Sequence, residues 1–285
     1  MNKKLLILGC GYSGQFISKQ LTAEGWRVFG TTRSKEHFKK FEESEIEPIL
    51  WNDISAFKYL ATDGCALLSS IAPRGQIDDG LARVEELLLD DRCNFTWFGY
   101  LSSTGVYGDR QGGWVTEVSN FDTINPKGKA RLKTEKKWLK LSDKCNIPLF
   151  IFRLAGIYGP ERSIFDRIKA GTVQKVVKPN QYFNRIHVED IAGAVCAGLK
   201  KPWLAGIYNV TDDLPSPSAD LIDEAVKLMG IPGLPEVNFN EANLSIMAKS
   251  FYSESKKVSN EKLKKTLGYS LKYPSYVSGI RSLTK

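Results

Sequence analysis

The chain has 285 residues, of which 42% are hydrophobic, and a formal net charge of +8. This size and composition suit one folded core, alone or with a smaller lobe. No run of about 18 apolar residues is present, so we expect no transmembrane helix. Five scattered cysteines form no Cys-x-x-Cys pair and there are only two histidines, which argues against a disulfide framework or a metal site. We expect reduced thiols in a cytoplasmic protein.

Part of the positive charge lies near the C-terminus, at Lys256, Lys257 and residues 262–265. Nucleic acid can exploit such a patch. However, no aromatic residues interleave with these lysines, and Glu254 and Glu261 interrupt them. We therefore interpret the patch as a solvated helix face and expect no nucleic-acid partner. A basic surface also favours anionic small molecules such as nucleotides.

The first 200 residues alternate short apolar runs with longer amphipathic ones. Residues 5–8 form a continuous apolar run, which is typical of a buried parallel strand. Residues 13–24 carry apolar side chains at helical spacing and end at Gly25, which predicts a helix. Similar reasoning predicts strands at 27–30, 48–51, 66–70, 96–101, 149–153 and 207–210, and helices at 78–89, 127–141 and 191–200.

Beyond about Thr211 the pattern changes, because prolines punctuate the chain and the strand–helix alternation stops. Helices are predicted at 218–229 and 260–267. We expect an α/β protein, with a doubly wound parallel Rossmann sheet and a smaller C-terminal lobe of mixed α/β structure that binds substrate. The expected division is a dinucleotide-binding domain at 1–159, completed by 185–211, and a lobe at 160–285, mainly 160–184 and 212–285.

A glycine-rich turn follows the first predicted strand and opens the first predicted helix. It reads Gly9-Cys10-Gly11-Tyr12-Ser13-Gly14, which is the Gly-x-Gly-x-x-Gly pattern. This pattern indicates dinucleotide binding when it lies between a strand and a helix, as it is predicted to do in this chain. Gly9 permits the tight turn, Gly11 lets the backbone approach a pyrophosphate, and Gly14 brings the helix close to the sheet. The helix N-terminus then offers free N–H groups to phosphate. We expect Gly9, Gly11, Tyr12, Ser13 and Gly14 to bind a dinucleotide.

The end of the second strand bears on which cofactor binds. An acid about 20 residues after the glycines would bind the ribose 2′-hydroxyl of NAD, but the chain has Thr32, Arg33 and Ser34 there. A guanidinium can form two charge-assisted bonds to a 2′-phosphate. The sequence therefore favours NADP(H) over NAD(H). The alternative is that Arg33 is an ordinary surface residue.

Three segments resemble the extended short-chain dehydrogenase/reductases, in particular the NAD-dependent epimerase/dehydratase family. They are residues 101–108 (LSSTGVYG), 153–160 (RLAGIYGP) and 185–192 (RIHVEDIA). Residues 208–210 and 255–279 are also similar to a bacterial subgroup of nucleoside-diphosphate-sugar epimerases. The resemblance covers nearly the whole chain. It implies an NAD(P)-dependent enzyme that acts on a nucleotide sugar or a related carbonyl or hydroxyl compound, and a homodimer formed by pairing helices beside the sheet.

Several residue roles follow from the resemblance alone. Ser103 matches the family's catalytic serine, which hydrogen-bonds the substrate oxygen. Asp53 and Ile54 match the pair that contacts the adenine. Ser70 and Ala72 lie in the loop that borders the nicotinamide ribose, and residues 154–156 match the turn that faces the nicotinamide ring.

The chain departs from the family at the proton relay, Tyr-x-x-x-Lys. With Glu135 as the register anchor, Lys127 stands at the tyrosine and Arg131 at the lysine. No tyrosine lies between Tyr107 and Tyr158, so a small shift in alignment does not restore the relay. Arg131 can still hold the nicotinamide ribose. Lys127 is either a base with a lowered pKa or an exposed lysine in the first turn of a helix.

These residues leave competing functions open. The first is an NADP-dependent oxidoreductase or epimerase that uses Ser103, Lys127 and Arg131. The second is a non-catalytic NADP(H)-binding sensor or regulator, since the relay is replaced. His187 is expected to join the two lobes, and Glu117 to be an ordinary loop carboxylate rather than a catalytic group.

Overall fold

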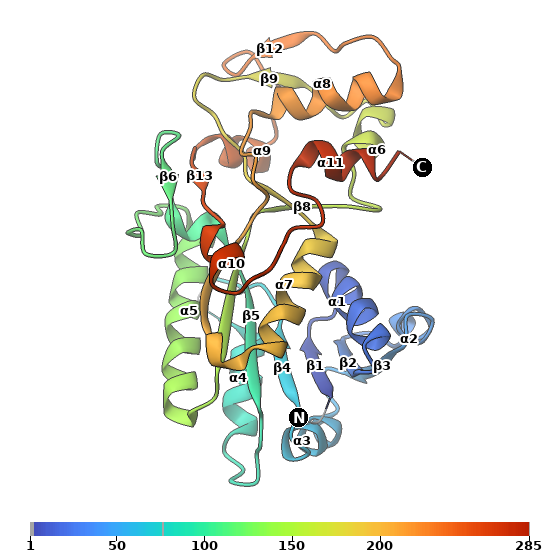
Figure 1. The fold of residues 1–285 in the computed structure, drawn as a ribbon, viewed down its shortest axis with the longest axis vertical. Coiled ribbons are helices and arrows are strands. Elements are labelled where there is room, and N and C mark those ends of the chain that lie inside the picture. The colour runs from blue at the N-terminus through green and yellow to red at the C-terminus, as the bar shows by residue number, and fades with distance from the viewer. Residues whose placement is uncertain (1–2, 76, 285) are drawn as a thin grey trace.

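A parallel sheet organises the protein. The structure, a computed structural model, describes residues 3–75 and 77–284, and within them seven strands form one parallel sheet in the order β11-β7-β5-β4-β1-β2-β3 (Figure 1). The order reverses between β1 and β4, as in a doubly wound Rossmann fold. The strands are β1 (Lys4–Leu8), β2 (Arg27–Thr32), β3 (Ile46–Leu50), β4 (Ala66–Ser69), β5 (Trp97–Ser103), β7 (Leu149–Leu154) and β11 (Gly206–Val210).

The strand sequences are mostly apolar because both faces of the sheet are covered by helices. Leu5 to Leu8 are all fully buried. Strand β1 lies between β2 and β4, with Leu5 opposite Val28 on one side and opposite Ala66 on the other. Strand and helix positions predicted from the sequence are confirmed to within a few residues, and so is the fold class.

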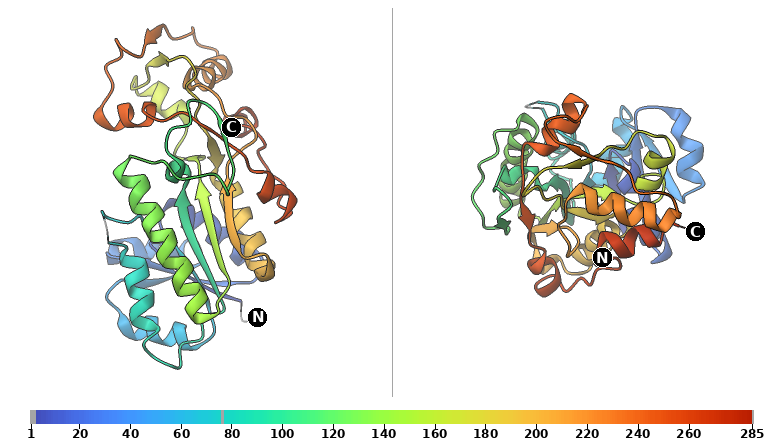
Figure 2. Two further views of the ribbon diagram at one scale, coloured as in Figure 1. Left: turned by 90° about the vertical axis from the view of Figure 1, so that its left-hand side faces the viewer. Right: turned by 90° about the horizontal axis from the view of Figure 1, so that it is seen from above.

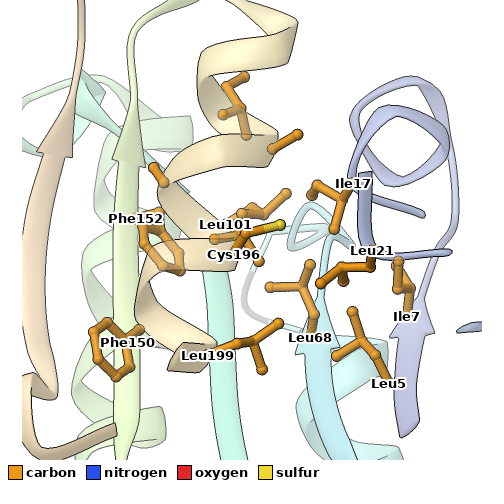
Figure 3. Close-up of a cluster of buried hydrophobic side chains, with 14 of the residues drawn as sticks. Leu5, Ile7, Ile17, Leu21, Leu68, Leu101, Phe150, Phe152, Cys196 and Leu199 are labelled. Carbon is orange, nitrogen blue, oxygen red and sulfur yellow. The ribbon is translucent and has the colours of Figure 1, made fainter. Parts of the chain in front are cut away.

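Helices cover the two faces in separate sets. Helices α1 (Tyr12–Ala23) and α7 (Val188–Lys200) pack on one face, where Ile17, Leu21 and Leu199 meet side chains from β1, β4, β5 and β7 (Figure 3). The other face carries α3 (Ile54–Thr62), α4 (Asp79–Leu87) and α5 (Pro126–Cys145) (Figure 2). None of the helices in the described ranges is long and apolar enough to cross a lipid bilayer.

Several helices differ from the sequence prediction, among them α3 and α5. Helix α3 was not predicted, and it begins because the Asp53 side chain accepts the backbone N–H of Ala56 at its N-cap. Helix α5 is longer than expected. Pro126 occupies its first turn behind the Asn125 cap, and the helix stops only at Asn146, which adopts the left-handed conformation. The short segments η1 (Lys35–His37) and α2 (Phe38–Glu42) follow β2.

The remaining elements gather beyond the carboxyl edge of the sheet (Figure 1). Their core holds Phe165, Ile222, Val226 and Ile280. Two pairs of short parallel strands contribute, β8 (Gly156–Tyr158) with β10 (Arg185–His187) and β9 (Lys175–Val177) with β12 (Glu236–Asn238). The helices are α6 (Ile164–Lys169), α8 (Ser218–Met229), α9 (Ile246–Tyr252) and α11 (Tyr276–Arg281).

The chain returns from this lobe to the sheet before its last helix. Strand β13 (Lys257–Val258) pairs with β6 (Trp114–Val115). Helix α10 (Glu261–Lys265) then lies near β11, and Leu263 enters the core beside the sheet. Buried Lys256 donates to the backbone oxygen of Gly108 at 2.8 Å. This segment therefore fastens the lobe to the loop that follows η2 (Thr104–Tyr107). A further short turn, η3 (Pro202–Leu204), links α7 to β11.

A buried ion pair joins α5 to the sheet. Arg153 of β7 is fully buried, and its Nη2 and Nε donate to the two carboxylate oxygens of Glu135 at 2.8 and 3.1 Å. Arg153 Nη1 also donates to the Tyr107 hydroxyl, which donates in turn to Asn209 Oδ1 at 2.6 Å. Ser102 donates to Glu135 as well. The network ties β5, β7, β11, η2 and α5 together.

We expect Arg153→Met to lower the free energy of unfolding by about 3–5 kcal/mol, because it leaves the Glu135 carboxylate buried without its partner. Urea unfolding followed by tryptophan fluorescence measures the change. The double variant Arg153→Met, Glu135→Leu removes both charges and is expected to recover at least half of the loss. A double variant less stable than the single one would contradict this view of the pair.

Candidate functional site

The glycine-rich turn lies where the strand order reverses, at the carboxyl end of β1. Gly9 has φ +71°, and a Cβ there would lie 2.7 Å from Ile71 Cγ1, so only glycine fits. The backbone N–H of Gly9 donates to Thr31 Oγ1 at 2.8 Å, and that of Cys10 to the Thr31 oxygen. These bonds to β2 hold the turn in place.

Helix α1 begins in this turn with an open N-terminus. Gly11 is the exposed N-cap and supplies no side-chain cap, and a Cβ built on it would come near only the Gly9 oxygen, at 3.9 Å. Gly14 is buried, and a Cβ there would lie 3.0 Å from Cys10 Sγ, so the helix approaches the sheet closely. Ser13 is also buried. The free N–H groups and the positive end of the helix dipole together suit an anion.

Tyr12 connects this helix end to the smaller lobe. Its hydroxyl donates to the Pro160 oxygen at 2.7 Å, and the Arg162 guanidinium lies 4.3 Å from the centre of its ring. Burial raises the pKa of Tyr12 to about 12, so the phenol stays protonated. The sequence placed Tyr12 in the motif but gave no sign of its contact with residues 159–162, which are distant along the chain.

The end of β2 carries polar side chains and no acid. Thr32 Oγ1 lies 3.0 Å from His37 Nδ1, and Ser34 Oγ accepts the N–H of Glu36. Arg33 is exposed and forms no ion pair with any described residue. By contrast, Arg27 at the start of the same strand pairs with Glu47. A cation without a partner therefore stands at the carboxyl edge of the sheet, one strand away from the glycine turn.

The other expected cofactor contacts follow β3 and β4. Asp53 accepts the Ser55 hydroxyl at 2.6 Å and the Ala56 N–H at 3.1 Å, and these bonds lower its pKa. Ile54 is partly exposed and Ala72 is exposed. Ser70 donates its backbone N–H to Leu8 beside the glycine turn. The structure thus aligns these positions along one edge, from β3 across β1 to β4.

The expected catalytic residues lie farther along the same edge but do not form a relay. Ser103 ends β5, and its Oγ accepts the Gly105 N–H at 3.1 Å, which leaves the hydroxyl hydrogen free to donate. Lys127 is exposed in the first turn of α5. Arg131 turns inward, and its Nη1 donates to the Tyr100 hydroxyl at 2.9 Å and to the Leu101 oxygen at 2.7 Å.

Arg131 has buried neighbours that the sequence did not single out. Tyr100 is fully buried, and burial raises the pKa of its phenol. Asp78 is 5% exposed and caps α4 by accepting the Leu81 N–H at 2.8 Å. Burial raises the pKa of Asp78, while the charge of Arg131 opposes that rise. A single tyrosine or aspartate at these positions gives no signal in the sequence, because the cluster joins three separate elements, β5, α4 and α5.

Two other candidate bases, Glu117 and His187, form contacts that hold parts of the fold together. Glu117 Oε1 accepts the Asn209 N–H at 2.8 Å, which fixes the loop before α5. His187 is 1% exposed, lies against the rings of Tyr158 and Tyr273, and accepts the Glu189 N–H on Nδ1. Burial lowers the pKa of His187 to about 4, so the ring is neutral near pH 7. Across the described ranges, no cluster of three or more His, Cys, Asp or Glu side chains is arranged to hold a metal ion.

A cavity of about 910 Å³ lies in the smaller lobe. It begins at Gly156, Ile157 and Tyr158 of β8, directly after β7, and extends into the smaller lobe as far as α8 and α9. Sites of this volume accept small molecules. The cavity approaches the start of α1 at Arg162, which lines it and also lies against the Tyr12 ring.

Comparison with known proteins identifies the fold and the family. Residues 5–211 match the model of the NAD dependent epimerase/dehydratase family. Protein YeeZ of Escherichia coli K12 is 30% identical over 223 residues, covering 73% of this chain and 77% of YeeZ. A functionally unknown conserved protein from Silicibacter pomeroyi DSS has a TM-score of 0.89 and 39% identity, over 99% of this chain and 98% of that chain.

Two more distant solved structures share the fold and contain ligands. The human epimerase family protein SDR39U1 (isoform 2), solved with NADPH, has a TM-score of 0.76 and 14% identity over 99% of both chains. UDP-glucuronic acid 4-epimerase from Bacillus cereus, in complex with UDP-glucuronic acid and NAD, has a TM-score of 0.77 and 18% identity. That match covers 99% of this chain and 98% of the epimerase.

The glycine turn gives a test that separates folding from binding. We expect Gly11→Ala to change the free energy of unfolding by less than about 1 kcal/mol, because a Cβ has room there. The same methyl group would occupy the approach of a pyrophosphate, so NADPH affinity is expected to fall at least about tenfold. Isothermal titration calorimetry and urea unfolding measure the two effects.

Gly9→Ala is the matched control, since it forces alanine into a positive φ against Ile71. It is expected to lose about 1–3 kcal/mol of stability. Full NADPH affinity in Gly11→Ala would show that the turn does not hold the pyrophosphate.

Proposed function

The chain belongs to the NAD dependent epimerase/dehydratase family, and from that premise we propose that it is an NADP(H)-dependent oxidoreductase or epimerase. It transfers hydride between the cofactor and a carbonyl or carbinol carbon of a small molecule. The observation that carries the proposal is the sheet edge itself, where the open N-terminus of α1 stands one strand from the unpartnered Arg33. These are the two features that a diphosphate bridge and a 2′-phosphate require.

The preference for NADP(H) rests on charge at the end of β2. An NAD site would place an acid there to bind the ribose 2′-hydroxyl, and an acid would repel a 2′-phosphate. Arg33 and the hydroxyls of Thr32 and Ser34 supply donors instead. The fold accommodates either cofactor, since SDR39U1 was solved with NADPH and the Bacillus cereus epimerase with NAD.

Catalysis requires a hydrogen bond to the substrate oxygen and a proton for it. NADP(H), when bound, supplies or accepts the hydride. Ser103 keeps a free hydroxyl hydrogen because its oxygen serves as acceptor to Gly105, so we assign it to the substrate oxygen. Lys127 is assigned to proton transfer. Arg131 has no acceptor for Nη2 or Nε among the described residues and is assigned to the nicotinamide ribose.

The relay residues also support a second candidate, a non-catalytic NADP(H)-binding sensor or regulator. Arg131 already donates to Tyr100 and Leu101, and Lys127 is exposed rather than enclosed. A protein that binds the cofactor tightly and turns over no carbonyl compound would fit this candidate. The substrate class of the enzyme, a nucleotide sugar or another carbonyl compound, depends on the cavity.

Arg33→Ala tests the 2′-phosphate assignment. We expect NADPH affinity to fall about 10- to 100-fold, because hydrogen bonds to a charged group contribute about 1.5–3 kcal/mol, while NADH affinity stays unchanged. Calorimetry with each nucleotide measures both. Arg27→Ala is the matched control at the other end of β2 and is expected to alter neither affinity. An equal loss for NADPH and NADH in Arg33→Ala would contradict the assignment.

Ser103→Ala tests catalysis. We expect kcat to fall about 100-fold, the effect of removing a donor to a developing oxyanion, with NADPH affinity preserved. The assay follows NADPH absorbance with UDP-glucose, UDP-glucuronic acid and straight-chain aldehydes. Ser102→Ala is the matched control, since its hydroxyl faces Glu135 instead, and it is expected to retain turnover. Tight NADPH binding without turnover on any compound would favour the sensor.

A further inference from the structure

The cavity of about 910 Å³ is placed to receive the substrate. Its inner end is formed by β8, which follows β7 after the turn at residues 154–156. The resemblance puts the nicotinamide ring at that turn. The rest of the cavity extends away from the sheet between α6, α8 and α9, so it holds the part of the substrate that lies beyond the reacting carbon.

The cavity wall is largely apolar. Phe183 and Tyr252 meet edge to face, with ring centres 5.1 Å apart and planes at 79°. The apolar surface continues to the mouth, where Phe251 of α9 is 62% exposed. Strands β8 and β9 and helix α8 contribute further apolar side chains to the wall, among them Ile157, Val176, Leu221 and Ile222.

The cation on the inner wall is already bonded. Arg185 of β10 is 8% exposed, and its Nη1 donates to Ser216 Oγ at 2.8 Å and to the oxygens of Ser216 and Phe183 at 3.3 and 3.2 Å. Its Nη2 donates to the Pro217 oxygen at 3.3 Å. The guanidinium therefore already donates to oxygen atoms of the protein. A phosphate could bind it only by displacing those acceptors.

The other charged groups that line the cavity lie at its rim and balance one another. Arg162 and Arg167 are both exposed to solvent, and the Arg162 guanidinium lies 4.3 Å from the centre of the Tyr12 ring. Glu161 is exposed beside them, and Asp166 accepts the Ser163 hydroxyl at 2.6 Å. Among the described residues that line the cavity there is no lysine.

A diphosphate brings negative charge that must be paired when it leaves water, since burial of an unpaired ion is strongly unfavourable. The inner wall has no free cation to pair it, whereas apolar surface is stabilised there by leaving water. We infer that the substrate is an uncharged, largely apolar carbonyl or alcohol compound and not a nucleoside diphosphate sugar. This inference rests on the proposed function and specifies its substrate class.

The test uses the full-length protein and the uncharged naphthalene ketone prodan, whose fluorescence shifts to the blue in apolar surroundings. We expect saturable binding that excess UDP-glucose does not displace. Leu221→Asp puts a charge on the cavity wall and is expected to weaken prodan binding at least about tenfold. Ile231→Asp, a partly exposed apolar residue of the same lobe that does not line the cavity, is the matched control and is expected to bind prodan normally.

Phe251→Asp keeps the test decisive if Leu221→Asp unfolds the lobe, because Phe251 lines the cavity but is mostly exposed. Turnover provides a second readout. With NADPH and straight-chain aldehydes of increasing length, we expect kcat/KM to rise about three- to fourfold for each added methylene until the cavity is filled.

Displacement of prodan by UDP-glucose, normal prodan binding in both cavity variants, or turnover of UDP-sugars without any dependence on aldehyde length would each overturn the inference. NADPH binding is measured separately by calorimetry. Prodan binding without NADPH binding would remove the proposed function and leave the apolar cavity established. NADPH binding without prodan binding would leave the proposed function standing and remove the inference about the substrate.

Discussion

The buried pair between Arg153 and Glu135 is the constraint on which the site geometry depends. Both side chains are desolvated, so the attraction between them mainly offsets the cost of their burial and adds little net stability. The pair instead fixes the position of α5 relative to the sheet. Glu135 lies one helical turn after Arg131, so the pair fixes how α5 is rotated against β7. Tyr107 and Asn209 extend the same network to η2 and β11, and Ser103, at the end of β5, directly precedes η2.

This orientation of α5 determines the contacts of Arg131 in a helix that lacks the family's tyrosine and lysine. Where the family has a lysine, this chain has Arg131, whose guanidinium offers a planar set of donors. In this protein the donors hold Tyr100 and the Leu101 oxygen. Arg131 therefore tightens the contact of α5 with β5 and keeps a positive charge at the sheet edge. Under the proposed function, proton transfer falls to Lys127, which lies nearer the solvent.

The parts of this arrangement that the sequence predicted are those encoded by local pattern. Leu5 to Leu8 and Gly9 to Gly14 identify a strand, a turn and a helix within a few residues, and the fold class follows from their repetition. Helix α3 escaped prediction because it is short and its start depends on a cap by Asp53. The stacking of Arg162 on Tyr12, the cluster of Asp78 with Arg131, and the cavity depend on contacts between distant segments, which single-sequence pattern does not carry.

The contact at Tyr12 also shows how the site divides its recognition chemistry. Pro160 and Arg162 contact Tyr12 at the start of α1, and residues 161–163 line the cavity, so one loop borders both the cavity and the glycine-rich turn. On the sheet side, free N–H groups and Arg33 stand at an exposed edge, where charge on a ligand is partly solvated. On the lobe side, Arg185 is bonded to backbone oxygens and the wall is apolar. Unpaired charge is tolerated far better at the solvated edge than against the apolar wall of the cavity, which agrees with the proposal that the phosphates belong to the cofactor and the apolar body to the substrate.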